Sequence, residues 1–167
     1  TAVGYNALKE HTTGNSNTAI GYGAMDETGA GNNSSQNTAV GANAMGGDWG
    51  NTSEQNTAVG SGAMSGVLNG ATANVAVGYL AADAITTGDY NVAVGSVALD
   101  ALLSTNNNVA IGFSAMGLST VGTECTFVGA NAGADGVITA AAAGSVGIGS
   151  QALLNLTSGA RNTAVGY

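Results

Sequence analysis

Very few residues of this chain have side chains that could carry out acid–base or nucleophilic chemistry. The sequence holds one histidine, His11, and one cysteine, Cys125. No nucleophile or orienting acid is spaced so as to make His11 a catalytic base, so we expect a surface histidine. Cys125 stands at a repeat position that is otherwise mostly Asn, which favours a buried structural thiol over a nucleophile.

The ten acidic residues are dispersed along the chain. Asp26 and Glu27 are adjacent, but no EF-hand loop or Asp-bearing glycine-rich nonapeptide is present, so a structural metal stays only a minor alternative. The segment Gly21-Tyr22-Gly23 is not followed by a helical pattern and does not predict a phosphate-binding loop. We therefore expect no catalytic residue, no cofactor and no metal site, and we expect that the protein is not an enzyme.

Trp49 is the one aromatic residue whose surroundings suggest ligand binding. It follows Asp48 in a polar, glycine-rich stretch, Gly46 to Asn51. An exposed indole there could stack on a sugar or anchor a protein receptor, so Trp49 and Asp48 are the candidate ligand-binding residues. The alternative is that Trp49 folds back over the body of the molecule and packs there.

The composition excludes several classes of protein. The chain has 167 residues, 28 of them Gly and none Pro, and 44% are hydrophobic while 7% are charged. The missing proline excludes collagen, and the hydrophobic content argues against intrinsic disorder. No apolar run approaches the roughly 18 residues that span a bilayer, so we expect no membrane insertion. A net charge of −8 argues against a nucleic-acid partner.

A short phrase, Asn-Thr/Val-Ala-Val/Ile-Gly, recurs along the whole chain. Its Gly recurs every 17 to 20 residues, at positions 4, 21, 41, 60, 78, 95, 112, 129, 149 and 166. The residue before this Gly is always Val or Ile, and the one before that is Ala except at Phe127 and Gly147. A period this short fits one coil of a parallel β-solenoid. We predict an all-β fold of about nine to ten coils, with residues 1–167 forming a single repetitive segment of a longer fibre.

Strand alternation divides each phrase into two faces. We predict that the Val and Ile before each Gly point into the coil and that the Ala and Gly face lies outside, where another backbone can approach closely. One coil buries little apolar surface, so this outer face is expected to be a subunit interface. The candidate interface residues are Ala19, Ala39, Ala58, Ala76, Ala93 and Ala110.

The Asn that opens the phrase recurs at one corner of the coil. Stacked Asn side chains can bond to one another and to the turn backbone. Cys125 and Ser145 interrupt the series, which suggests a local weakening. The predicted ladder consists of Asn17, Asn37, Asn56, Asn74, Asn91, Asn108 and Asn162.

The phrases Asn17-Thr18-Ala19-Ile20-Gly21 and Asn108-Val109-Ala110-Ile111-Gly112 closely resemble the YadA-like head repeats of trimeric autotransporter adhesins. The longer form Asn162-Thr163-Ala164-Val165-Gly166-Tyr167 is similar to repeats of phage tail fibres. This resemblance implies a left-handed parallel β-roll that assembles as a parallel homotrimer. The period is longer than that of the adhesin repeat, so the loops are expected to be larger.

We therefore expect a structural and adhesive segment of a trimeric extracellular fibre, in a virion tail or on a bacterial surface. Its partners would be itself, as a homotrimer, and a host surface glycan or protein receptor that the sequence does not name. One alternative is an ice- or mineral-binding solenoid, although Thr18, Thr38 and Thr57 give way to Val75, Val92 and Val109 at the equivalent position. Another is a non-catalytic part of a glycan-cleaving spike, since the paired carboxylates that such cleavage needs are not evident.

Overall fold

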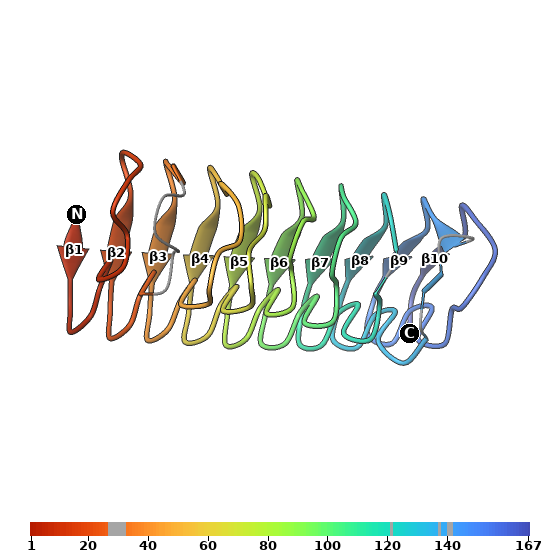
Figure 1. The fold of residues 1–167 in the computed structure, drawn as a ribbon. Coiled ribbons are helices and arrows are strands. Elements are labelled where there is room, and N and C mark those ends of the chain that lie inside the picture. The colour runs from red at the N-terminus through yellow and green to blue at the C-terminus, as the bar shows by residue number, and fades with distance from the viewer. Residues whose placement is uncertain (27–32, 121, 137, 140–141) are drawn as a thin grey trace.

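The computed structural model describes residues 1–26, 33–120, 122–136, 138–139 and 142–167. Its described residues form ten short strands in a single sheet, laid side by side along the molecule (Figure 1). The strands are β1 (Ala2–Val3), β2 (Thr18–Ile20), β3 (Thr38–Val40), β4 (Thr57–Val59), β5 (Val75–Val77), β6 (Val92–Val94), β7 (Val109–Ile111), β8 (Thr126–Val128), β9 (Val146–Ile148) and β10 (Thr163–Val165).

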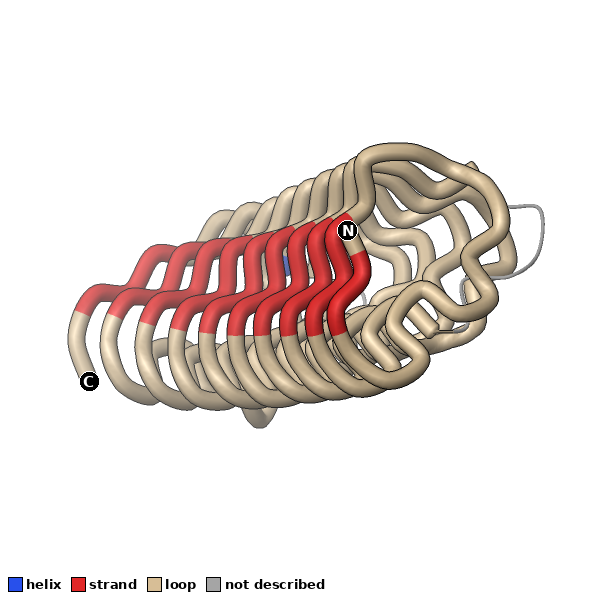
Figure 2. The backbone as a smooth tube through the Cα atoms, turned by 90° about the vertical axis from the view of Figure 1, so that its left-hand side faces the viewer, coloured by secondary structure: helices blue, strands red, loops and turns tan. Residues whose placement is uncertain are grey.

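Each strand pairs in parallel with the strand of the next coil, and the order in the sheet is the order in the chain. The register matches equivalent residues: Ala19 pairs with Ala39 across a 20-residue coil, and Ala76 pairs with Ala93 across a 17-residue coil. The extra residues of the longer coils are therefore absorbed in the loops. The predicted all-β parallel solenoid is confirmed, with about nine coils, and the strands form one continuous band along the rod (Figure 2).

The repeat Gly allows the chain to leave the sheet directly after each strand. Gly21 has a φ of 138°, and a Cβ atom built on it would lie 2.4 Å from the carbonyl oxygen of Gly41 in the next coil. Both the backbone conformation and the closeness of the neighbouring coil thus exclude a side chain. This is the physical reason that the phrase always ends in Gly.

The two faces of the strands are the reverse of the prediction. In β2 to β9 the middle residue is buried, while the first and last residues are half-buried or exposed. In β6, for example, Ala93 is completely buried and Val94 lies on the outer face. The prediction that Val and Ile point into the coil is therefore wrong. The interior already holds the Ala and Met or Leu side chains that follow each Gly, so only a small residue fits at the middle of the strand.

Phe127 shows how narrow this interior is. It occupies the middle position of β8, where almost every other strand has Ala, and it is completely buried. Its ring takes the space next to two glycines: a Cβ on Gly133 would lie 2.8 Å, and one on Gly147 2.7 Å, from the Phe127 ring. Gly147 is the strand partner of Phe127 in the next coil. The large side chain of Phe127 therefore fills the volume that Gly147, which has no side chain, leaves empty in the next coil.

The rest of the core comes from the segment after each Gly and from the loops. The Ala three residues after the Gly and the residue after it are mostly buried, as in Ala24 and Met25. Loop residues complete the interior: Trp49, Leu68, Ile85, Leu102 and Ile138. Within the described part of the chain, no helix has the length and apolar character needed to cross a membrane.

Candidate functional surfaces

The predicted asparagines Asn17 to Asn108 form one hydrogen-bonded ladder inside the rod. The backbone N–H of Asn91 donates to Oδ1 of Asn74 at 2.9 Å, and its Nδ2 donates to the same oxygen at 3.1 Å. That Nδ2 also donates to the carbonyl oxygen of Thr105 at 2.8 Å, which ties the ladder to the loop one coil ahead. Each buried amide thus satisfies both its own polar atoms and the backbone around it.

The ladder changes character at Cys125. The backbone N–H of Cys125 still donates to Oδ1 of Asn108 at 3.0 Å, but no side-chain amide continues the series there. Burial raises the pKa of the Cys125 thiol above its usual value. Asn162, the last predicted member, lies beyond Ser145: its backbone N–H donates to Ser145 Oγ at 3.2 Å, and its side chain bonds to Gly159 rather than to another Asn.

His11 lies next to the first residue of the ladder rather than on open surface. The Nδ2 atom of Asn17 is 2.8 Å from His11 Nε2, and it also donates to the carbonyl oxygen of Ser34 at 2.8 Å. An amide N–H can donate only to an unprotonated ring nitrogen, which fits the neutral imidazole. Burial lowers the pKa of His11 below its ordinary value, while the backbone of Ser34 acts weakly in the opposite direction.

Trp49 does not lie where a ligand could reach it. Its side chain is 1% exposed and belongs to the interior column of loop residues. The next residue, Gly50, donates its N–H to the carbonyl oxygen of Leu68 at 3.0 Å, which holds this loop against the following coil. Asp48 is exposed, so the two candidates do not form a joint binding site. The ligand-binding prediction for Trp49 is wrong, and the alternative, in which Trp49 folds back and packs on the body of the molecule, is confirmed.

The six predicted interface alanines lie inside the coil. Ala19, Ala39, Ala58, Ala76, Ala93 and Ala110 all have 0% exposure in the single chain. A side chain that is buried within its own subunit has no surface to offer a neighbour. The prediction that these alanines form an intersubunit face is therefore wrong, for the same reason that the strand faces are reversed.

The surface that the sheet does present is a band of β-branched side chains. It consists of two rows, the Thr or Val that opens each of the strands β2 to β10 and the Val or Ile that closes every strand. In the closing row, Ile20, Val77 and Ile111 are 40%, 36% and 38% exposed. None of the strands contains a charged residue. We call this band the outer sheet face; it runs along the ten-stranded sheet (Figure 2).

The acidic residues do not gather into a site. Within the described ranges, no group of three or more His, Cys, Asp or Glu side chains is arranged to hold a metal ion. Asp83 and Asp100 occupy equivalent loop positions on successive coils. Burial raises the pKa of the Asp100 carboxyl, with a smaller contribution from the charge of Asp83.

A second surface was not anticipated from the sequence. The residue after the repeat Gly is Tyr or Phe in five of the ten copies, and these rings are exposed. Tyr5 and Tyr22, on adjacent coils, stack with their ring centroids 5.5 Å apart and their planes 13° from parallel. The signal lies in the motif itself, at the residue that directly follows the repeat Gly.

Comparisons with protein-family models, curated proteins and solved structures found no match for this chain.

Proposed function

We propose that this chain is a rod segment of an extracellular attachment fibre, in a phage tail or on a bacterial surface. In this proposal the coils are left-handed and three parallel chains associate along their length. The partner is the chain itself, and the loops and edges of the rod meet a host surface glycan or protein. The resemblance of the repeat to adhesin heads and tail fibres supports this proposal.

The observation that carries the proposal is the outer sheet face. It is uncharged, rich in β-branched residues and continuous over the ten strands. The closing row of Val and Ile makes a continuous exposed apolar strip, and such strips are typical of protein–protein interfaces. Because successive rows repeat at the strand spacing, a parallel copy presents matching rows at the same heights. Association through this face would also supplement an interior that consists largely of alanine.

The mass of the chain in solution tests the association. Light scattering should give about three times the chain mass of 15.9 kDa, with no change on dilution through the micromolar range. A folded monomer across that range would contradict the homotrimer.

Ice binding is a second candidate, and one structural observation favours it. The unequal loops do not disturb the strand register, so the outer sheet face is a regular array rather than an interrupted one. Thr18, Thr38 and Thr57 lie on this face beside the Val and Ile row. An ice-recrystallisation assay separates the two candidates: inhibition by a monomeric chain would favour ice binding, whereas a trimer without inhibition would favour the fibre.

A further inference from the structure

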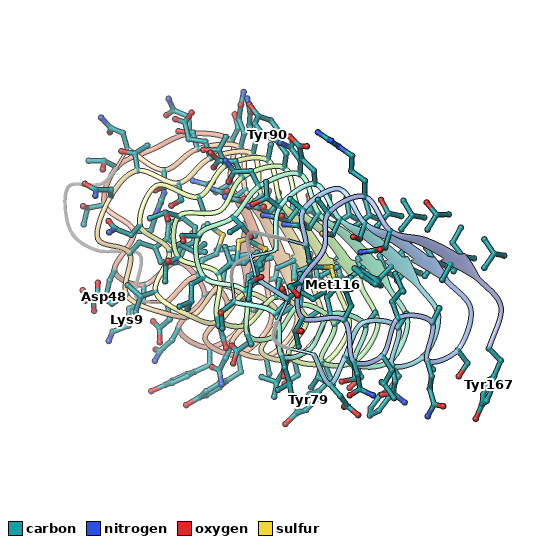
Figure 3. The ribbon with its side chains drawn as sticks, turned by 90° about the vertical axis from the view of Figure 1, so that its right-hand side faces the viewer. Lys9, Asp48, Tyr79, Tyr90, Met116 and Tyr167 are labelled. Atoms are coloured by element: carbon teal, nitrogen blue, oxygen red, sulfur yellow. The ribbon has the colours of Figure 1, made fainter. Side chains whose placement is uncertain are left out.

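The residues that follow the repeat glycines form a row along one edge of the rod, around the corner from the outer sheet face. Figure 3 shows Tyr79 and Tyr167, from distant coils, projecting outward at this same edge. The aromatic members are well exposed, with Tyr79 at 57% and Phe113 at 58%. We call this the edge row: Tyr5, Tyr22, Ala42, Ser61, Tyr79, Ser96, Phe113, Ala130, Ser150 and Tyr167.

The backbone holds the edge row at the spacing of the sheet. The carbonyl oxygen of Tyr79 accepts a hydrogen bond from the N–H of Val97 at 2.9 Å, and that of Ser96 accepts one from Ser114 at 3.0 Å. Phe113 repeats the pattern with Asn131 at 2.8 Å. Successive members are therefore about 4.8 Å apart along the rod.

The Tyr5–Tyr22 pair shows what this spacing does to rings on adjacent coils. Their nearly parallel planes and 5.5 Å centroid distance place one aromatic ring per coil in a stack. Tyr79 and Phe113 are two coils apart, with Ser96 between them. Ser96 carries no ring, so the exposed rings of Tyr79 and Phe113 are separated by two strand spacings, about 9.6 Å, which matches the separation that one inserted ring needs.

The chemistry around this gap fits a sugar ring. The C–H faces of a pyranose stack on aromatic rings, and its hydroxyl groups can bond to the hydroxyl of Ser96. The edge row carries no charged residue, and the chain as a whole has a net charge of −8. A neutral sugar is thus favoured over a sialylated or sulfated one, which the acidic rod would repel.

We propose that Tyr79, Ser96 and Phe113 form a binding site for a neutral pyranose, such as the terminal sugar of a surface glycan. This inference rests on the adhesive function proposed above and gives it a ligand class and a place on the rod. Three such sites in a trimer, at fixed spacing, would turn a weak single contact into firm attachment.

Saturation-transfer NMR on the full 167-residue chain tests the site, with the methyl β-glycosides of glucose, galactose and N-acetylglucosamine as probes. At least one of these sugars should receive magnetisation from the wild-type protein. Phe113→Ala removes one stacking surface, and Ser96→Tyr fills the gap with a ring. Each should weaken binding by roughly tenfold or more. Tyr90→Ala is the control, because Tyr90 is 61% exposed and lies at the opposite edge (Figure 3).

Three results would overturn the inference. These are no transfer to any of the three sugars, undiminished transfer in Ser96→Tyr, or an equal loss in Tyr90→Ala. Light scattering on the same samples separates this inference from the proposed function. A trimer that binds no sugar would defeat the pyranose site alone. A change of mass in Phe113→Ala would show instead that the edge row is a contact between subunits.

Discussion

The narrow interior of the rod limits the size of the side chains that can be buried there. The middle strand position accepts Ala in most coils, and the single Phe127 is accommodated only beside Gly133 and Gly147. Trp49 is the other large ring of the interior, in the column that also holds Leu68. These positions contribute to stability through packing and not through ligand contacts.

Trp49→Ala is predicted to lower the free energy of unfolding by about 3–5 kcal/mol, because it leaves a large cavity in the interior. Urea unfolding followed by circular dichroism measures the change. Asp48→Ala is the matched control, since the neighbouring side chain is exposed and should change stability by less than about 0.5 kcal/mol. Equal effects of the two substitutions would contradict the burial of Trp49.

His11 should make the first coils sensitive to acid. Burial lowers its pKa in the folded chain, so the unfolded chain takes up the proton first as the pH falls through the ordinary value of 6.5. Stability from the neutral imidazole is complete above that pH and decreases below it, when Asn17 loses its acceptor. The difference in unfolding free energy between wild type and His11→Gln should therefore shrink from pH 7.5 to about pH 5. A difference that grows on acidification would contradict the assignment.

The repeating structural element of this protein is the coil, and the sequence predicts its strands and the way the coils stack. The repeated Gly and the β-branched residues before it predict the strands, and the spacing predicts the parallel solenoid. Alternation alone cannot tell which face is inside, because that depends on what lies across the coil. Here the Ala and Met of the next segment fill the interior and leave the β-branched residues outside. The burial of Trp49 is one of the two alternatives that the sequence leaves open, and loops of unequal length do not reveal which path the chain takes.

The observed orientation of the strands, with the middle residue inside and the last residue outside, can be tested at two neighbouring residues of β6. Ala93→Leu should destabilise the coil by about 1–3 kcal/mol or more, because the interior has no room for three further carbon atoms. Val94→Leu, one residue later on the outer sheet face, should change the free energy of unfolding of the single chain much less. Denaturant unfolding of both variants gives the comparison. A larger effect at Val94 would restore the original assignment of faces.

The Asn ladder links each coil to the next, so the loss of one Asn should destabilise mainly the coils on either side of it. Asn91→Ala leaves the N–H of Asn108 and the carbonyl oxygen of Thr105 without their partners inside the rod, at a cost of about 2 kcal/mol or more. Hydrogen exchange should show faster exchange in the two neighbouring coils than in distant ones. The exposed Asn155 provides the control, because its φ is not positive and Asn155→Ala should leave the exchange pattern unchanged.

At the scale of the whole molecule, the rod has two surfaces of different character. The outer sheet face is uncharged and consists of Thr, Val and Ile side chains, which suits association with copies of itself. The edge row combines exposed rings with small hydroxyl side chains, which suits a sugar. The charged residues lie in the loops, whose lengths vary from coil to coil. The extra residues of the longer coils also lie in these loops, so neither the outer sheet face nor the edge row is interrupted.

The central claim is that the outer sheet face holds three chains together, and light scattering on two charge variants tests it most directly. Val94→Asp places a carboxylate on that face, whereas Ser96→Asp places the same charge on the edge row. The wild type and Ser96→Asp should have three times the chain mass. Val94→Asp should be a folded monomer with an unchanged β-rich circular dichroism spectrum, because an unpaired charge is too costly to bury between subunits. A Val94→Asp protein that keeps the trimer mass would contradict the claim.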